Sequence, residues 1–169
     1  MTRAVLSIGS NEGDRLANLR SAVNAFSPYL HGTSAVFQTP PWGPVPQPEF
    51  LNAVLIVADD GADALDWLAR GQACEQAAGR LREVHWGPRT LDVDVVTVSD
   101  SGRDIVSDDP LLTLPHPRAA ERAFVLVPWW SVDPEAELPG HGSVLELMQA
   151  LPPAEVEAVR MMAGMELRA

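Results

Sequence analysis

The stretch "TLDVDVVTV" at residues 90–98 is the clearest strand in the chain. Leu91, Val93 and Val95 alternate there with Asp92 and Asp94. Successive side chains of a strand point to opposite faces, so the apolar residues are expected in the core. The two carboxylates are expected together on the other face, roughly 6.5 to 7 Å apart at Cα. Such a pair can be a solvated strand face or a Mg²⁺ site, since hard cations bind carboxylate oxygens and share the rest of their shell with phosphates.

The segments before this strand alternate between strand and helix patterns. They are, in order, a strand at 4–9, a helix at 14–26, strands at 33–39 and 49–57, and a helix at 62–83. The two middle strands are joined by "PPWGPVPQP" (40–48), whose five prolines and one glycine exclude regular structure. The order βαββαβ predicts an α+β, ferredoxin-like sandwich.

The residues after the sandwich are expected to form a C-terminal extension. The pattern predicts a turn-rich hairpin or loop at 99–110, a short helical region at 118–130 and a late helix at 143–151. The length of 169 residues suits one core, so residues 1–169 are predicted to be a single domain.

Composition limits the classes of partner. The chain has 23 acidic and 12 basic residues and a net charge of -11, which would repel a nucleic-acid backbone. No apolar run approaches the ~20 residues of a membrane span, and the N-terminus lacks a basic, apolar signal segment. Cys74 is the only cysteine, so a buried structural thiol is expected. We expect a cytoplasmic monomer that binds neither nucleic acid nor membrane.

The basic residues nevertheless gather near the acidic strand. All twelve are arginines, and six of them fall within 43 residues that also hold His85 and His116. The six are Arg80, Arg82, Arg89, Arg103, Arg118 and Arg122. Guanidinium groups suit phosphate oxygens, so carboxylates for a metal beside arginines for phosphate suggest phosphoryl chemistry. A single arginine is usually a surface residue, and only the combination is informative. The chain has no Gly-rich loop with lysine, which excludes a P-loop kinase.

A second candidate site lies on the strand at 49–57. Phe50 and Asn52 share one strand face, where an aromatic ring and an amide would suit a planar heterocycle. The alternative is an aromatic residue at a strand edge beside an ordinary asparagine. Trp42 in the neighbouring proline-rich segment favours the binding site.

Five motifs in this order resemble one enzyme family. They are "SIGSNEGDRLANL" (7–19), "TPPWGP" (39–44), "FLNAV" (50–54), "GRLREVHWGPRTLDVDV" (79–95) and "LPHPRAAERAFVL" (114–126). The combination resembles the 6-hydroxymethyl-7,8-dihydropterin pyrophosphokinases of folate biosynthesis over roughly residues 5 to 130. The resemblance implies a ferredoxin-like fold and transfer of the β,γ-pyrophosphoryl group of ATP to the pterin hydroxymethyl oxygen, leaving AMP.

The resemblance also implies roles for individual residues. Asp92 and Asp94 would hold two Mg²⁺ ions against the ATP phosphates and, with Arg82 and Arg89, would be the catalytic residues. The ATP site would comprise Gln72, Glu75, Arg82, Trp86, Thr113, His116 and Arg122. The pterin pocket would comprise Thr39, Pro40, Trp42, Phe50, Asn52 and Phe124.

The chain departs from the common family pattern at several of these motifs. The departures are Phe37 and Gln38 before the Thr-Pro-Pro, Trp42, Phe50, His85, Leu111 and Pro117. They affect the expected affinity for pterin and nucleotide rather than the reaction.

Two other classes of protein share parts of this pattern. A nucleotidyltransferase also carries two strand aspartates and a Gly-Ser turn, but it would place that turn just before the acids, not some eighty residues away. A ferredoxin-like regulatory module could bind nucleotide or metal without turnover. The products formed from ATP in the presence of the pterin distinguish all three.

Overall fold

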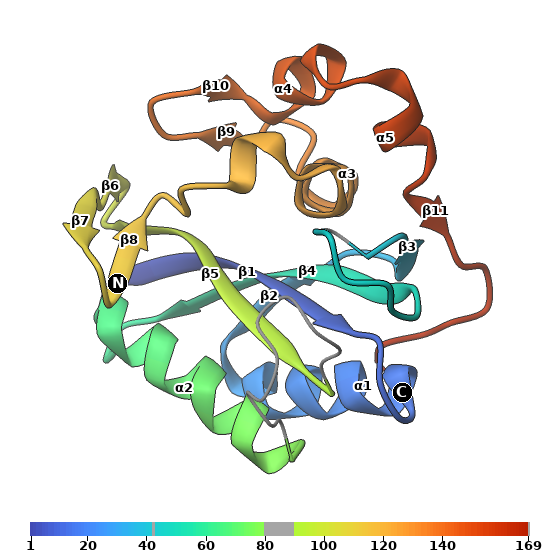
Figure 1. Cartoon of the computed structure of the whole chain (residues 1–169). Helices are drawn as coiled ribbons and strands as arrows, with labels where there is room; N and C mark the ends of the chain where they lie inside the picture. Colours follow the sequence, from blue (N-terminus) through green and yellow to red (C-terminus); the bar gives the residue numbers. More distant parts are fainter. Residues whose placement is uncertain (42, 80–89, 169) are drawn as a thin grey trace.

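The computed structural model describes residues 1–41, 43–79 and 90–168, and its centre is an antiparallel sheet. Three long strands form the middle of the sheet: β1 (Thr2–Ser10), β4 (Phe50–Asp59) and β5 (Asp92–Asp100). β1 lies between the other two and pairs antiparallel with both (Figure 1).

Four short strands complete this sheet. They are β2 (Leu30–Thr33), β3 (Phe37–Thr39), β6 (Arg103–Asp104) and β11 (Arg160–Met161). The order across the sheet is β11-β3-β4-β1-β5-β6, and β2 also pairs with β4. The α+β class predicted from sequence is therefore confirmed.

Helices cover both faces of the sheet (Figure 1). α1 (Arg15–Phe26) and α2 (Ala64–Ala77) lie on one face. α3 (Ala123–Val132), α4 (Val144–Ala150) and α5 (Pro153–Glu157) lie on the other. Short 3₁₀ turns at Ser27–Tyr29 and Ala119–Glu121 follow α1 and precede α3. Two small ribbons, β7 (Ser107–Asp109) with β8 (Leu112–Leu114) and β9 (Glu137–Leu138) with β10 (Gly142–Ser143), complete the fold.

Local sequence explains where the two long helices begin. The Asp14 carboxylate accepts a hydrogen bond from the Ala17 amide and caps α1. Asp63 and Asp66 form a reciprocal capping box at the start of α2. Such caps satisfy amides that have no partner within the helix, and each contributes about 1 kcal/mol.

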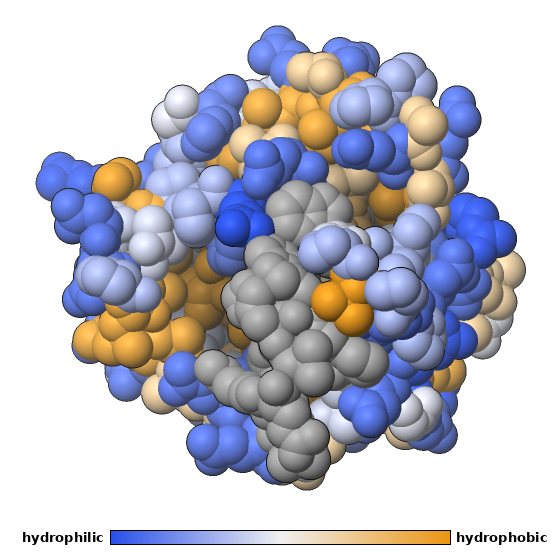
Figure 2. Space-filling view, viewed as in Figure 1, coloured by the Kyte–Doolittle hydropathy of each residue, from blue (hydrophilic) through white to orange (hydrophobic). Residues whose placement is uncertain are grey.

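The sheet separates two apolar cores. Leu91, Val93 and Val95 are buried on the side of α1 and α2, as the alternation in the sequence predicts. Val54 and Val96 are buried on the side of α3. Figure 2 shows the apolar residues on one face of the molecule as separate patches among polar ones. Within the described residues, no helix has the length and apolar character to cross a membrane.

The pairing of β1 with β5 contains a β-bulge. Leu6 faces Val95 while the preceding Val5 faces Thr97, so Val96 is an extra residue on β5. A bulge bends its strand and is common next to active sites. The Val96 carbonyl accepts a hydrogen bond from the His116 amide at 2.8 Å. The bulge is thus the point at which the segment after β8 docks on the sheet.

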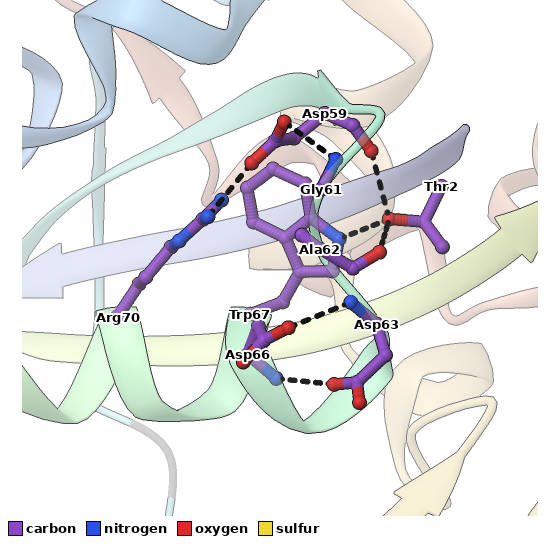
Figure 3. A network of polar contacts seen from close by, with 8 residues as sticks. All are labelled: Thr2, Asp59, Gly61, Ala62, Asp63, Asp66, Trp67 and Arg70. Atoms are coloured by element: carbon purple, nitrogen blue, oxygen red, sulfur yellow. Dashed lines mark hydrogen bonds and ion pairs between the residues drawn. The ribbon is translucent and has the colours of Figure 1, made fainter.

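A polar cluster fixes the end of the sheet that lies farthest from Asp92 (Figure 3). Trp67 Nε1 donates to Thr2 Oγ1 at 2.9 Å, and that hydroxyl donates to the Ala62 carbonyl at 2.7 Å. Arg70 donates to Asp59 at 2.7 Å. A hydrogen bond from the Gly61 amide and the contact with Arg70 lower the pKa of Asp59. These contacts anchor α2 to β1 through Thr2 and to the end of β4 through Asp59.

Several predicted boundaries need correction. The strand expected at 33–39 is two strands, β2 and β3, separated by residues 34–36. The helix expected at 62–83 ends at Ala77, and residues 80–83 lie outside the described residues. The extension contains α5 and β11, which sequence analysis missed because the segments are too short for a periodic pattern.

Candidate active site

The register of the central strands brings the two candidate sites onto one face of the sheet. Gly9 of β1 faces Asn52 of β4 on one side and Asp92 of β5 on the other. Directly facing residues of an antiparallel sheet point to the same side, so Asn52 and Asp92 share a face across Gly9. Ser7 faces Asp94 in the same way. This is the face that α3 covers, because Val54, which also faces Ser7, is buried there.

The two carboxylates lie opposite the buried valines, as the alternation predicts. Asp92 and Asp94 are half-buried, and Arg122 lies 3.6 Å from Asp94 between Nη1 and Oδ2. Arg122 immediately precedes α3, so the start of that helix brings a positive charge to the acidic pair. Among the described residues, no third histidine, cysteine or acidic side chain joins the pair in a metal-binding cluster.

His116 is held beside this pair in its neutral form. Burial lowers its pKa to about 4, and the nearby Arg122 charge acts in the same direction. His116 Nδ1 accepts a hydrogen bond from the Arg118 amide at 3.2 Å. Because a neutral imidazole that accepts at Nδ1 carries its proton on Nε2, the ring can donate one hydrogen bond from Nε2.

The candidate pterin residues form a compact group beside Gly9. Asn52 is only 4% exposed, and its Nδ2 donates to Thr39 Oγ1 at 2.6 Å. A Cβ on Gly9 would stand 2.5 Å from Asn52 Oδ1 and 3.4 Å from Phe50 Cδ1. Glycine at this position is therefore what allows the Asn52 amide to lie over β1. The strand pattern alone did not predict this role of Gly9, although a glycine inside an apolar strand was a signal.

The start of α3 links the two groups. The guanidinium carbon of Arg122 lies 5.4 Å from the centroid of the Phe124 ring. Phe124 is half-buried and packs against the core on the α3 side. One short segment thus carries a residue expected at ATP and a residue expected at the pterin.

Glu75 reaches β5 from α2. It is 5% exposed, and its Oε2 accepts a hydrogen bond from the Val93 amide at 3.0 Å. Val93 lies between the two aspartates, and within the described part of the chain no strand covers the outer edge of β5 there. The Glu75 carboxylate therefore satisfies an edge amide. The sequence carries no local pattern that would predict this contact between Glu75 and Val93.

The remaining expected residues fall into two groups. Gln72 is half-buried on α2, Thr113 Oγ1 donates to the Asp109 carbonyl at 3.1 Å, and Pro40 is exposed. Arg82, Trp86, Arg89 and Trp42, together with His85, lie outside the described residues. Their roles stay predictions.

Comparison with known proteins identifies similar sequences and folds. Residues 5–134 match the family model of 7,8-dihydro-6-hydroxymethylpterin-pyrophosphokinase. The 2-amino-4-hydroxy-6-hydroxymethyldihydropteridine pyrophosphokinase of Mycobacterium tuberculosis H37Rv is 46% identical over 169 residues, covering 95% of this chain and 90% of that protein. The enzyme of the same name from Methylorubrum extorquens is 40% identical over 163 residues, covering 94% of this chain and 99% of that protein.

Solved structures show the same fold. A crystal structure of Plasmodium falciparum HPPK-DHPS superposes with a TM-score of 0.64 at 12% identity, over 86% of this chain. The chain spans 44% of the length of that protein. At this identity the likeness concerns the fold alone.

Proposed function

This chain belongs to the 7,8-dihydro-6-hydroxymethylpterin-pyrophosphokinase family, and we propose that it transfers pyrophosphate from ATP to 6-hydroxymethyl-7,8-dihydropterin. The products are AMP and the pterin diphosphate, and the step belongs to folate biosynthesis. The observation that carries the proposal is the row Asn52, Gly9 and Asp92, in which an amide suited to a heterocycle and a carboxylate suited to a metal share one face of adjacent strands.

Asp92 and Asp94 are the proposed ligands of Mg²⁺. The donor set fits this ion, because two carboxylates that share a face leave the other positions of an octahedral shell to water and phosphate oxygens. We propose two ions, as the family resemblance implies. When bound, Mg²⁺ neutralises charge on the phosphates and supports departure of AMP.

Arg122 and His116, a cationic and a neutral hydrogen-bond donor near the carboxylates, would hold the transferred end of ATP. Arg122 already lies beside Asp94, so its guanidinium is placed beside the position that a phosphate bound against the carboxylates would take. His116 would donate one hydrogen bond from Nε2 without adding charge. Asp92 would orient the attacking hydroxyl, while Arg82 and Arg89 are proposed for the phosphate path on the resemblance alone.

The pterin would lie between Phe50 and Phe124, with its polar edge on Asn52. Stacking on both faces favours a flat heteroaromatic ring, and an amide can both donate to and accept from its edge. Because Thr39 holds Asn52 Nδ2, the orientation of the amide is set before the substrate binds. Pro40 and Trp42 are the other proposed members of this pocket, and Gln72, Glu75, Trp86 and Thr113 are proposed on the ATP side.

We also propose the finer features expected from sequence. The strand order with α1 and α2 on one face supports a ferredoxin-like core made of β1, α1, β2 and β3, β4, α2 and β5. A single domain, a monomer and a cytoplasmic location remain part of the same proposal.

The experiment that tests the reaction identifies the products formed from ATP. The purified protein with Mg²⁺, ATP and 6-hydroxymethyl-7,8-dihydropterin should release AMP in a 1:1 ratio with pterin diphosphate. Attack at the γ-phosphorus would give ADP, and attack at the α-phosphorus, as by a nucleotidyltransferase, would give free pyrophosphate. Either product in stoichiometric amount would refute the proposal. The absence of turnover would favour a regulatory module.

A further inference from the structure

The base of the proline-rich segment (residues 40–48) holds polar side chains that the proposed reaction does not use. Gln38 of β3 precedes the segment, and Glu49 follows it immediately before β4. Gln38 Nε2 donates to Glu49 Oε2 at 2.6 Å, so one contact joins the two ends of the segment. We propose that Glu49, held by Arg160 of the C-terminal strand β11, is a positioning residue for the pterin pocket.

Two arginines from distant parts of the chain complete this contact. Arg160 Nη2 donates to Glu49 Oε2 at 3.3 Å. Arg15 Nη1 of α1 donates to the Glu49 carbonyl at 3.1 Å and reaches Gln38 Oε1 at 3.4 Å. Each end of the segment is therefore bonded to the other and to a separate element of the fold.

A second tie holds the last residues of the segment. Asn11, which is 2% exposed, follows β1. Its Nδ2 donates to Gln47 Oε1 and to the Pro48 carbonyl, both at 2.9 Å. Asn11 therefore holds the end of the proline-rich segment that leads into Phe50 and Asn52. It does so from the end of β1, the strand that contains Gly9.

β11 contributes by covering the free edge of β3. Arg160 faces Gln38 and Met161 faces Phe37 in this pairing, and the Met162 amide donates to the Val36 carbonyl at 2.9 Å. β11 lies beyond residue 134, where the match to the family model ends. A segment outside the matched region therefore supports a strand inside it.

Thr39 connects these contacts to the pterin pocket. This residue is 1% exposed at the end of β3, and its Oγ1 accepts the hydrogen bond from Asn52 Nδ2. If β3 and Glu49 shift relative to each other, the acceptor that orients Asn52 shifts with them. The inference rests on the proposed function, because it assigns Asn52 to the pterin.

The Glu49–Arg160 pair is suited to positioning rather than to stability. The two side chains are 41% and 59% exposed, and ion pairs at this exposure add little to the free energy of folding. Loss of the pair should therefore change pterin binding more than the melting temperature. ATP is expected on the β5 side of the site, so its binding should stay unchanged.

The experiment compares Glu49→Ala, Glu49→Gln and Arg160→Ala with the wild-type full-length chain. The readouts are kcat, the KM values for pterin and ATP, and the Kd of 6-hydroxymethylpterin with a non-hydrolysable ATP analogue and Mg²⁺. Glu49→Ala should raise the pterin KM and Kd roughly three- to tenfold, the range expected for losing hydrogen bonds that fix a binding group. The ATP KM should change less than twofold. Glu49→Gln keeps an acceptor for Gln38 and should recover part of the loss.

Arg20→Ala is the matched control. Arg20 also ties α1 to the C-terminal region, because its Nε donates to the Glu166 carbonyl at 2.7 Å, but it makes no contact with Glu49 or Gln38 in the described structure. Its pterin KM should equal that of the wild type. Arg160→Ala should have the effect of Glu49→Ala in weaker form, and the double variant should be no worse than Glu49→Ala alone.

Three outcomes would overturn the inference. They are an unchanged pterin Kd in Glu49→Ala, equal changes in the pterin and ATP constants, and an equal effect in Arg20→Ala. Should Glu49→Ala fail to fold, Arg160→Ala decides the matter, because it alters an exposed side chain near the end of the chain. Failure of the proposed function itself is recognised separately, since the wild-type protein would then not bind the pterin.

Discussion

Gly9→Ala should disable the pterin pocket without unfolding the protein. The added Cβ would lie 2.5 Å from Asn52 Oδ1. An ordinary contact needs about 3.5 Å, so the amide must move by roughly 1 Å. The buried Asn52 has little room for this, and a shift of that size would stretch its 2.6 Å hydrogen bond to Thr39 beyond hydrogen-bonding distance.

The size of the effect follows from what is displaced. Overpacking by one methyl group costs about 1 to 3 kcal/mol of folding free energy. A misplaced amide that leaves a buried polar edge of the ligand unpaired costs a similar amount in binding, about 1 to 3 kcal/mol or roughly five- to 150-fold in the pterin Kd. Binary binding of ATP should change little, because the three atoms nearest to the new Cβ all belong to Asn52 and Phe50.

A double-mutant cycle with Asn52→Ala isolates this mechanism. Once the Asn52 side chain is removed, the next contact of the added methyl is Phe50 Cδ1 at 3.4 Å, so Gly9→Ala should cost much less in that background. Gly61→Ala is the control, because a Cβ there meets its nearest atom, Asp59 Oδ1, at an ordinary 3.7 Å. Calorimetric titration with pterin and an ATP analogue measures the loss of pterin affinity, and urea unfolding measures the loss of folding free energy. A folded Gly9→Ala protein with wild-type pterin affinity would refute the placement of Asn52 at the pterin edge.

Three further predictions follow from the same site. Asp92→Ala and Asp94→Ala should each lower turnover at least ~10²-fold with the fold retained, because each removes a proposed Mg²⁺ ligand; near-native Mg²⁺-dependent turnover would contradict the assignment. Glu75→Leu should lower the free energy of unfolding by about 1 to 3 kcal/mol in urea titrations, since it leaves the Val93 amide unsatisfied, while Glu75→Gln should retain most of the stability. His116 has a folded-state pKa of about 4 against 6.5 unfolded, so the unfolded chain binds more protons between these values and stability should fall as pH drops from 6.5 to 4. Allowing for partial exposure of the ring, the wild type should lose about 2 kcal/mol more than His116→Asn between pH 7 and 4.5, and parallel pH profiles would contradict the buried neutral ring.

Local periodicity was sufficient to predict most of the fold. The alternation in 90–98 placed Val93 and Val95 in the core and Asp92 and Asp94 on the opposite face, and both placements agree with the structure. The order of strands and helices through β5 was also predicted from periodicity and turn residues, except that the single strand expected at 33–39 is two strands, β2 and β3. The prediction failed where structure depends on partners distant in sequence, as for β11, whose two residues form a strand only because β3 offers a free edge.

Part of the geometry of the candidate site was also predictable from the sequence. The shared face of Phe50 and Asn52 follows from the two-residue period of a strand, and the family resemblance supplied the other expected residues. The role of Gly9 was not predictable, because it requires the register of three strands to be known. The hydrogen bond from the Val93 amide to Glu75 and the hydrogen bond from Gln38 to Glu49 likewise depend on tertiary packing. Arg82, Trp86, Arg89 and Trp42 stay predictions.

The bulge at Val96 constrains which insertions and deletions this strand can accept. Even-numbered residues of β5 face α3 before the bulge, whereas after it Val98 faces α2. Because Val96 is the extra residue, deleting it would restore a regular alternation and leave the pairs of Leu6 with Val95 and of Val5 with Thr97 in place. Deleting Val93 instead would bring Asp92 or Asp94 into the apolar core. A one-residue deletion should therefore leave the faces of β5 intact at Val96 but not at Val93, and most natural variation in length should fall in the β6 to β8 loops, where no alternating face has to be preserved.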